Sequence, residues 1–99
     1  MAVSGPVVLV GCGRLGSAIL EGWLLSETVA ASDLIILSPS EKPAAETARA
    51  KGARTNPPLE VLTEAAVIVL AVKPALWREV MAPLAPFLDD RAVILSVMA

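Results

Sequence analysis

A glycine-rich turn near the start of the chain constrains its fold more than any other feature. The largely β-branched run Val7–Val10 leads into Gly11-Cys12-Gly13-Arg14-Leu15-Gly16, and a helical pattern begins directly afterwards. A strand, a Gly-x-Gly-x-x-Gly turn and a helix in this order indicate dinucleotide binding. Gly11 permits the tight turn, Gly13 lets a pyrophosphate approach the backbone, and Gly16 lets the helix pack closely on the strand. The first N–H groups and the dipole of the helix favour an anion there. The alternative is a tight strand–helix turn that binds no ligand.

Length and hydropathy indicate one domain built on a covered sheet. The chain has 99 residues, 56% of them hydrophobic, with a mean hydropathy of +0.70. The longest apolar run, Ala65 to Val72, is far shorter than the ~18 residues of a membrane span. Short apolar runs of this kind are typical of parallel strands that are covered on both faces. Alternatively, part of the apolar surface serves a partner or a further domain.

Charge and cysteine content exclude some function classes. The net charge of −2 comes from 8 basic and 10 acidic residues without charge runs, which argues against a nucleic-acid surface. A single cysteine rules out an internal disulfide and is compatible with a reducing compartment, so we expect a cytoplasmic protein. Cys12 lies inside the glycine turn and the chain contains no histidine to activate it, so we expect a small turn residue.

The spacing of apolar and turn residues predicts five strands that alternate with helices. We expect strands over residues 6–10, 33–38, 53–55, 67–72 and 92–97. The helix after the glycine turn is expected to present an apolar face of Leu15, Ala18, Ile19 and Gly22, thickened by Trp23, Leu24 and Leu25. A close helix–sheet contact at Gly22 would offset the cost of a mid-helix glycine.

The later helices are predicted from caps and prolines. Ser40 is expected to cap a helix that starts near Pro43, buries Ala44, Ala45 and Ala48, and stops at Gly52. Asn56 and Pro57 are interpreted as the N-cap and first residue of a helix that turns Leu59, Leu62 and Ala66 inward. Lys73-Pro74 ends the fourth strand, and a helix with Trp77, Val80, Met81 and Leu84 is expected to bend or restart near Pro83. Asp89-Asp90 is expected to turn the chain into the last strand.

These elements predict a Rossmann-like α/β fold, a doubly wound parallel sheet of order 3-2-1-4-5 in one domain over residues 1–99. Right-handed crossovers and a switch point after the first strand give that order. Ligands of such sheets bind outside the carboxyl ends of the strands. We therefore expect residues 11–16, 38–42 and 71–74 to converge on one cleft.

The end of the second strand predicts the coenzyme. NAD-binding versions of this fold place an acidic residue there for the ribose 2′-hydroxyl. Ser38, Pro39 and Ser40 follow the strand here, with Lys42 just beyond, and Arg14 adds charge from the glycine turn. Hydroxyls and an ammonium suit a 2′-phosphate, so NADP(H) is favoured and NAD(H) is possible. The alternative is that Ser40 only caps a helix and Lys42 is solvated.

Four segments together resemble pyrroline-5-carboxylate reductases. Residues 11–22 resemble the opening glycine loop and first helix of that family, and Ser38-Pro39-Ser40-Glu41-Lys42 is similar to its segment after the second strand. Ala71-Val72-Lys73-Pro74 looks like its Val-Lys-Pro signature, and residues 94–99 look like the strand leading into its Ala-Gly turn. The segments occur in the family's order across the whole chain.

The resemblance implies an enzyme of proline biosynthesis that transfers hydride to the C=N carbon of 1-pyrroline-5-carboxylate, an imine, to give L-proline. It implies that the glycine turn holds the pyrophosphate, that residues 38–40 lie at the adenosine ribose and its phosphate, and that residues 71–74 line the nicotinamide-ribose side. Asn56 lies near the family's adenosine-contacting asparagine and is included. The family commonly has Asn or Gln where Arg14 stands and Asp where Ala66 stands.

The resemblance also sets limits on what this chain does alone. Family members continue past the Ala-Gly turn into a helical domain that dimerises and completes the imine site. We therefore expect the cofactor domain, which binds NADP(H) without reducing an imine, and a homo-oligomer in the full-length enzyme. The last strand and the helix with Trp77 are expected to expose apolar surface and to cause self-association.

No catalytic residue or metal ligand is assigned from the sequence. Lys73 is the one ionisable group beside the predicted nicotinamide, and a simple strand-end lysine is the alternative. We expect neither nucleic acid nor membrane as a partner. Two other functions stay open: another dehydrogenase with a similar domain, such as a hydroxyacid or deazaflavin-dependent oxidoreductase, and a nucleotide-sensing regulatory module.

Overall fold

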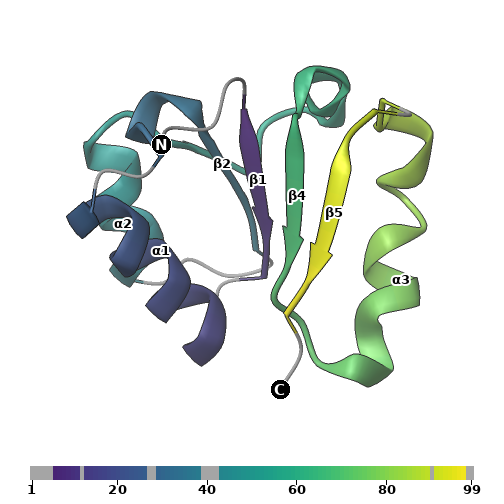
Figure 1. Ribbon diagram of the computed structural model, residues 1–99, viewed down its shortest axis with the longest axis horizontal. Helices are drawn as coiled ribbons and strands as arrows, with labels where there is room; N and C mark the ends of the chain where they lie inside the picture. The colour runs from purple at the N-terminus through teal and green to yellow at the C-terminus, as the bar shows by residue number, and fades with distance from the viewer. Residues whose placement is uncertain (1–5, 12, 27–28, 39–42, 90, 98–99) are drawn as a thin grey trace.

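The chain folds into a five-stranded parallel sheet with helices on both faces (Figure 1). The computed structural model describes residues 6–11, 13–26, 29–38, 43–89 and 91–97. The strand order is β3-β2-β1-β4-β5, which confirms the predicted α/β class and topology. The strands are β1 (Val7–Val10), β2 (Leu34–Leu37), β3 (Arg54–Thr55), β4 (Val67–Leu70) and β5 (Val93–Ser96).

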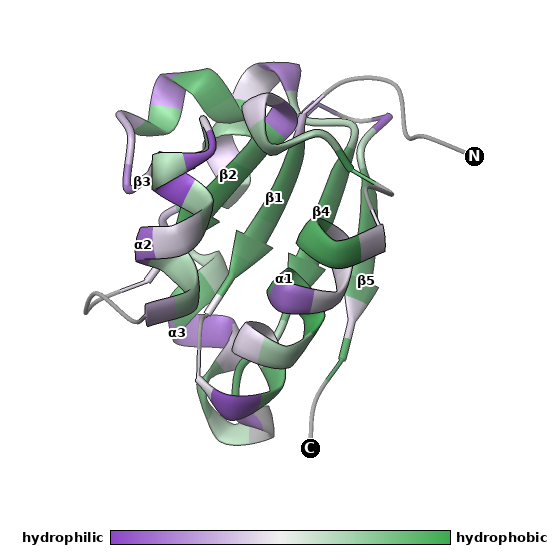
Figure 2. Ribbon diagram, turned by 90° about the vertical axis from the view of Figure 1, so that its left-hand side faces the viewer, coloured by the Kyte–Doolittle hydropathy of each residue, from purple (hydrophilic) through white to green (hydrophobic). Residues whose placement is uncertain are grey.

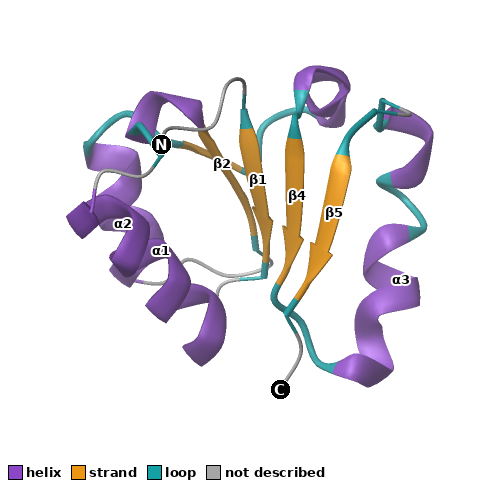
Figure 3. Ribbon diagram, in the orientation of Figure 1, coloured by secondary structure: helices purple, strands orange, loops and turns teal. Residues whose placement is uncertain are grey.

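Alternation along the strands divides the core into two layers. The helices α1 (Arg14–Ser26) and α2 (Pro43–Ala50) cover one face, and the segment containing α3 (Trp77–Met81) covers the other (Figure 3). Val7 and Leu9 belong to the first layer, whereas Val8 and Val10 belong to the second. All four residues of β1 are buried because helices lie on both sides.

The helix α1 matches the predicted face only in part: Ile19, Trp23 and Leu24 pack against the core as predicted, whereas other positions differ. Its buried residues are Gly16 and Leu20, while Ala18 and Gly22 are exposed. An added Cβ at Gly22 would have no heavy atom within 4 Å, so the predicted helix–sheet contact at Gly22 is wrong. Leu25 is 87% exposed and adds nothing to the core. The close contact between Gly16 and the glycine turn sets the rotation of the helix, which brings the row through Leu20 onto the sheet.

The helix α2 follows the prediction closely. Ala44, Ala45 and Ala48 are buried, and Gly52 adopts a φ of +117°. The N–H of Gly52 donates to the carbonyl of Arg49, and the N–H of Ala53 donates to that of Ala48. This pair of bonds is the Schellman arrangement, in which glycine ends a helix in the left-handed region. The predicted cap, Ser40, lies outside the described residues.

The segment after β3 corrects a second prediction. Asn56 is not a helix N-cap: the next helix is a 3-10 helix over Leu59–Glu64, preceded by Pro58. Two successive prolines place the helix start later than predicted, because the residue before a proline is biased away from helical conformation. Leu62 is still buried, as predicted.

The segment after β4 is helical in three short pieces. A 3-10 helix over Pro74–Leu76 precedes α3, the α-helix ends at Met81, and a second 3-10 helix covers Ala85–Phe87. The interruption predicted near Pro83 is therefore present, since proline has no N–H to continue the ladder. Leu84 is buried, while Trp77 is 40% exposed.

The two edges of the sheet differ in length and polarity. The edge strand β3 has two residues, Arg54 and Thr55, whereas β5 has four and is apolar over Val93–Leu95 (Figure 2). All four β5 residues are exposed, with Val93, Ile94 and Leu95 at about half of their accessible surface. The predicted exposure of the last strand is observed, and self-association stays a prediction. Within the described residues, no helix is both long and apolar enough to cross a membrane.

Candidate functional site

The glycine turn has a geometry that only glycine can adopt at position 11. Gly11 has a φ of +93°, and its N–H donates to the carbonyl oxygen of Leu37 at 2.8 Å. An added Cβ would lie 2.6 Å from the carbonyl oxygen of Ala71 and 2.9 Å from Cγ1 of Val72. A side chain at this position would therefore displace the residues that follow β4. The tight turn expected of Gly11 is present.

The other two glycines of the motif differ in their surroundings. An added Cβ at Gly16 would overlap the carbonyl oxygen of Gly11, so the absence of a side chain lets α1 contact the turn. Gly13, in contrast, has open space where its Cβ would be, with no heavy atom within 4 Å. This open side leaves room for a group to approach the backbone at the start of α1. The role of Gly13 in binding a pyrophosphate stays a prediction.

Backbone hydrogen bonds bring the ends of three strands together beside this turn. The bond from Gly11 to Leu37 joins the turn to the end of β2, and the N–H of Ala71 donates to the carbonyl of Val10 at 2.9 Å. At the end of β3, the carboxamide oxygen Oδ1 of Asn56 accepts a hydrogen bond from the N–H of Ser38 at 3.0 Å. Four residues therefore lie together at the carboxyl ends of the strands: Gly11, Ser38, Asn56 and Ala71. Cys12, Pro39, Ser40 and Lys42, also predicted site residues, lie outside the described residues.

A hollow of about 340 Å³, here called the apolar hollow, opens at the carboxyl ends of the strands. It is lined by Val10, Gly11, Leu37, Ser38, Asn56, Leu59, Val72, Val80, Pro83 and Leu84. None of the described residues in this lining is charged, and most of the surface that they form is apolar. Leu59, Val80, Pro83 and Leu84 were not predicted as site residues. Leu59, Val80 and Leu84 were predicted as core positions, and Pro83 as a helix interruption. The 3-10 helix before β4 contributes Leu59 to the hollow, and the broken helical segment after β4 contributes the other three.

A second hollow of about 220 Å³, here called the basic hollow, lies on the other side of the turn. Its lining is Gly13, Arg14, Leu15, Ala71, Val72 and Lys73. Arg14 and Lys73 are exposed cations, and the part of the lining that the structure describes holds no carboxylate. Val72 lines both hollows, so the two are adjacent. Pro74 begins the 3-10 helix that follows Lys73.

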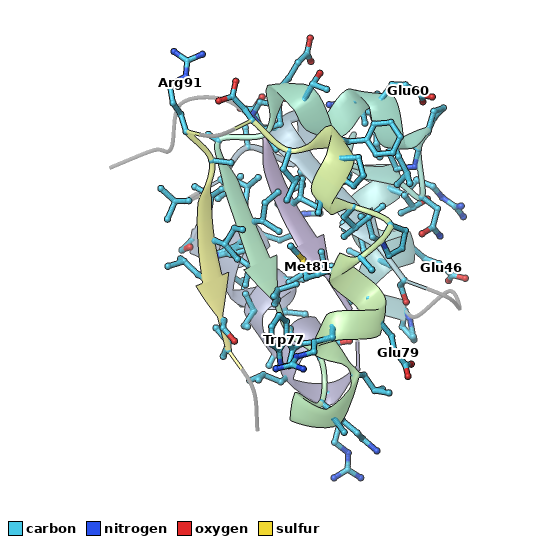
Figure 4. All side chains as sticks on the ribbon, turned by 90° about the vertical axis from the view of Figure 1, so that its right-hand side faces the viewer. Glu46, Glu60, Trp77, Glu79, Met81 and Arg91 are labelled. Atoms are coloured by element: carbon cyan, nitrogen blue, oxygen red, sulfur yellow. The ribbon has the colours of Figure 1, made fainter. Side chains whose placement is uncertain are left out.

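The ion pair of Asp89 and Arg91, whose pKa values are shifted, lies away from both hollows. Hydrogen bonds from the guanidinium and the N–H of Arg91 lower the pKa of Asp89, and the same contact raises the pKa of Arg91. Figure 4 shows Arg91 at the opposite end of the sheet from Trp77, which follows the carboxyl end of β4. This ion pair closes the turn before β5 and has no contact with the candidate site. Among the described residues, no group of three or more His, Cys, Asp or Glu side chains could hold a metal ion.

Comparison with known proteins assigns a family. Residues 6–99 match the family described as NADP oxidoreductase coenzyme F420-dependent. Pyrroline-5-carboxylate reductase 3 from Rattus norvegicus is 32% identical over 94 residues, which are 94% of this chain and 34% of that protein. The resemblance to pyrroline-5-carboxylate reductases is therefore confirmed, and the chain spans about a third of the length of this relative.

Solved structures support the same fold. A Plasmodium falciparum pyrroline carboxylate reductase with NADP bound has a TM-score of 0.77 and 21% identity over 99% of this chain and 35% of its own. Synechocystis arogenate dehydrogenase has a TM-score of 0.71 and 22% identity over 93% of this chain and 32% of its own. A Myxococcus stipitatus imine reductase variant in complex with NAD+ has a TM-score of 0.72 and 17% identity over 97% of this chain and 32% of its own. With its glycine turn and sheet order, this chain belongs to the family of coenzyme F420-dependent NADP oxidoreductases and is an NAD(P)-binding domain of an oxidoreductase.

Proposed function

We propose that this domain binds NADP(H) across the two hollows and serves the reduction of 1-pyrroline-5-carboxylate to L-proline. The observation that carries the proposal is that the two hollows share Val72 and meet at the glycine turn, where Gly11 lines one hollow and Gly13 lines the other. A dinucleotide has two nucleoside ends joined by a pyrophosphate. Two adjacent hollows joined at a glycine turn match that shape.

The chemistry of each hollow suits a different end of the coenzyme. The apolar hollow offers Leu37, Val72 and Val80 to a flat base, and it offers Ser38, whose N–H is bonded to the side chain of Asn56, to the ribose. The basic hollow offers Arg14 and Lys73, together with the N-terminal N–H groups of α1, to the negative pyrophosphate and to the nicotinamide nucleotide that follows it. This assignment orients the coenzyme with its adenosine towards β2 and its nicotinamide towards Lys73.

Selectivity for the phosphorylated coenzyme is proposed from the end of β2. Ser38 follows the strand directly, and among the described residues that line the apolar hollow there is no carboxylate that would repel a 2′-phosphate. The adjoining residues Ser40 and Lys42 supply a hydroxyl and a positive charge in the sequence.

The contribution of this domain to the reaction is binding and orientation. A bound nicotinamide supplies the hydride, and hydride transfer to an imine mainly requires that donor and acceptor carbons be aligned. Val72 and the backbone of Gly11 restrict where the coenzyme passes between the hollows, and Lys73 adds positive charge on the nicotinamide side. The substrate proposal is supported by the relative from Rattus norvegicus, which is named for this reduction.

The test is a titration of the chain with NADPH and with NADH, followed by calorimetry and by Trp23 and Trp77 fluorescence. We expect both to bind, NADPH more tightly, and no turnover of 1-pyrroline-5-carboxylate by the 99-residue chain alone. Failure of both coenzymes to bind would overturn the proposed function. Tighter binding of NADH would overturn the coenzyme preference, and turnover by this chain would show that the domain needs no further residues.

A further inference from the structure

Asn56 joins the end of β3 to the end of β2 in an unusual way. The residue is the only asparagine of the chain and has a φ of +47°, a left-handed conformation that asparagine adopts more readily than most residues. Its N–H donates to the carbonyl of Ile36 at 2.8 Å, which continues the parallel ladder by one residue beyond β3. The next bond of a regular parallel ladder would join the N–H of Ser38 to the carbonyl of Asn56.

The side chain of Asn56 takes the place of that carbonyl. The N–H of Ser38 donates to Oδ1 of Asn56 at 3.0 Å. The chain can therefore leave the sheet towards Pro57 while the amide of Ser38 stays satisfied. Because the donor is a backbone N–H, the accepting atom must be the carboxamide oxygen, and the NH2 group remains on the outer end of the side chain. Ser38 is buried, with 9% exposure, so an unpaired amide there would be costly.

Ser38 and Asn56 both line the apolar hollow, whose described lining has no charged group. Resting on the proposed function, we propose that Asn56 is a positioning residue for coenzyme selectivity: through its carboxamide oxygen it fixes the main chain of Ser38 where a 2′-phosphate is distinguished from a hydroxyl. Asn56 acts on the coenzyme through Ser38, and any direct contact of its NH2 group is additional.

Two substitutions separate the conformation from the oxygen atom. Asn56→Gly keeps the freedom for a positive φ and removes the acceptor. Asn56→Asp keeps the acceptor and adds a negative charge beside the hollow. Thr55→Val, on the neighbouring β3 residue, is the matched control. Each variant is titrated with NADPH and NADH, and exchange of the Ser38 amide is followed by NMR.

In Asn56→Gly, we expect the selectivity ratio, Kd for NADH over Kd for NADPH, to fall about fivefold while NADH affinity stays near wild type. The Ser38 amide should exchange faster. In Asn56→Asp, the amide should stay protected, and the ratio should fall at low salt and recover at about 0.5 M salt, where charges are screened. Thr55→Val should keep the wild-type ratio.

The results can separate this inference from the proposed function. If the wild type prefers NADPH and Asn56→Gly keeps its ratio, the positioning role fails and the proposed function stands. Equal losses for both coenzymes in Asn56→Gly would indicate a structural role and overturn the inference. A Ser38 amide that stays protected in Asn56→Gly would overturn it as well. A wild type that binds neither coenzyme would overturn both proposals.

Discussion

The apolar hollow and the basic hollow share Val72 and lie on either side of the glycine turn, yet they are built differently. The apolar hollow is formed by side chains from the ends of β1 and β2 and from the broken helical segment after β4, including Val80 and Leu84. The basic hollow is formed mostly by the turn and the segment after β4, with Arg14 and Lys73 exposed at its sides. Binding in the apolar hollow should depend on shape, and binding in the basic hollow on charge.

This difference determines how each hollow should respond to change. Apolar contacts depend on exact volume and little on salt, whereas contacts between exposed cations and phosphates are screened by salt and tolerate small shifts. The glycine turn, where the hollows meet, should be sensitive to any added volume, because backbone atoms of Ala71 and Gly11 occupy the space that side chains at Gly11 and Gly16 would need. Substitutions can therefore test the two hollows separately or together.

The largest effect is expected from Gly16→Ala, which acts on the glycine turn. A methyl group there would press on the carbonyl of Gly11, a backbone atom that cannot move away without moving the turn. We expect a loss of ~1–3 kcal/mol in the free energy of unfolding and a loss of detectable binding of both coenzymes. Gly22→Ala is the control on the same helix, because its new methyl meets open space. It should raise the free energy of unfolding by up to ~1 kcal/mol and leave binding unchanged. Urea unfolding measures the change in stability, and coenzyme titration measures the change in binding. Wild-type binding by Gly16→Ala would contradict the claim that the contact between Gly16 and Gly11 supports both hollows.

Val80→Phe should affect the apolar hollow alone. The phenyl ring is larger than the valine side chain and fills part of the apolar hollow beside Leu84. It should weaken the binding of adenosine 2′,5′-bisphosphate about tenfold, equal to ~1.4 kcal/mol. Nicotinamide mononucleotide, which is expected in the basic hollow, should bind as it does to the wild type. Val80→Ala, which enlarges the hollow, is the control. Calorimetry with the two fragments separates the outcomes, and equal losses for both fragments would argue against two distinct subsites.

Lys73→Gln and Arg14→Gln should each weaken the binding of NADPH and of NADH by the same factor, about threefold to fivefold. Both coenzymes share the pyrophosphate, and exposed charge contacts contribute modestly. The loss should shrink as salt is added, because screening already weakens these contacts in the wild type. Lys51→Gln removes the same charge at the opposite end of the strands, near Val29 and Ala30, and should change nothing. A selective loss of NADPH alone would place Lys73 or Arg14 at the 2′-phosphate instead.

The smallest effect is expected from Asp89→Asn, which lies in neither hollow. The lowered pKa of Asp89 means that its contact with Arg91 favours the folded chain above the ordinary range of an aspartate and that this contribution is lost as the pH falls through its folded pKa. Because the pair is exposed, the substitution should leave thermal unfolding at neutral pH and coenzyme binding unchanged. Unfolding scans from neutral to acid pH test this, and a change in binding would reveal a link to the hollows.

Much of this arrangement could be predicted because its signals are local. The run Val7–Val10 before the glycines, the prolines after β4 and the glycine at the end of α2 each specify backbone conformation within a few residues. From these signals the strand order and three converging segments followed.

The parts that were missed depend on contacts between distant residues. The buried row of α1 is set by Gly16 against Gly11, which residue spacing alone does not show. Asn56 followed by proline is typical of a helix start, and only its pairing with Ser38 identifies it as the end of a strand. Val80 and Leu84 reach the apolar hollow because α3 ends at Met81, so their role depends on where a short helix stops.

The one-sided pairing of β5 has a consequence for isotope exchange. The N–H of Val93 donates to the carbonyl of Ala66 and that of Val97 to the carbonyl of Leu70, so these amides face β4. Because successive amides of a strand point to opposite sides, those of Ile94 and Ser96 face outward. Deuterium should therefore enter the strand with a two-residue rhythm, quickly at Ile94 and Ser96 and slowly at Val93 and Val97. A polypeptide that pairs with this edge would slow the quick positions, and the rhythm would disappear.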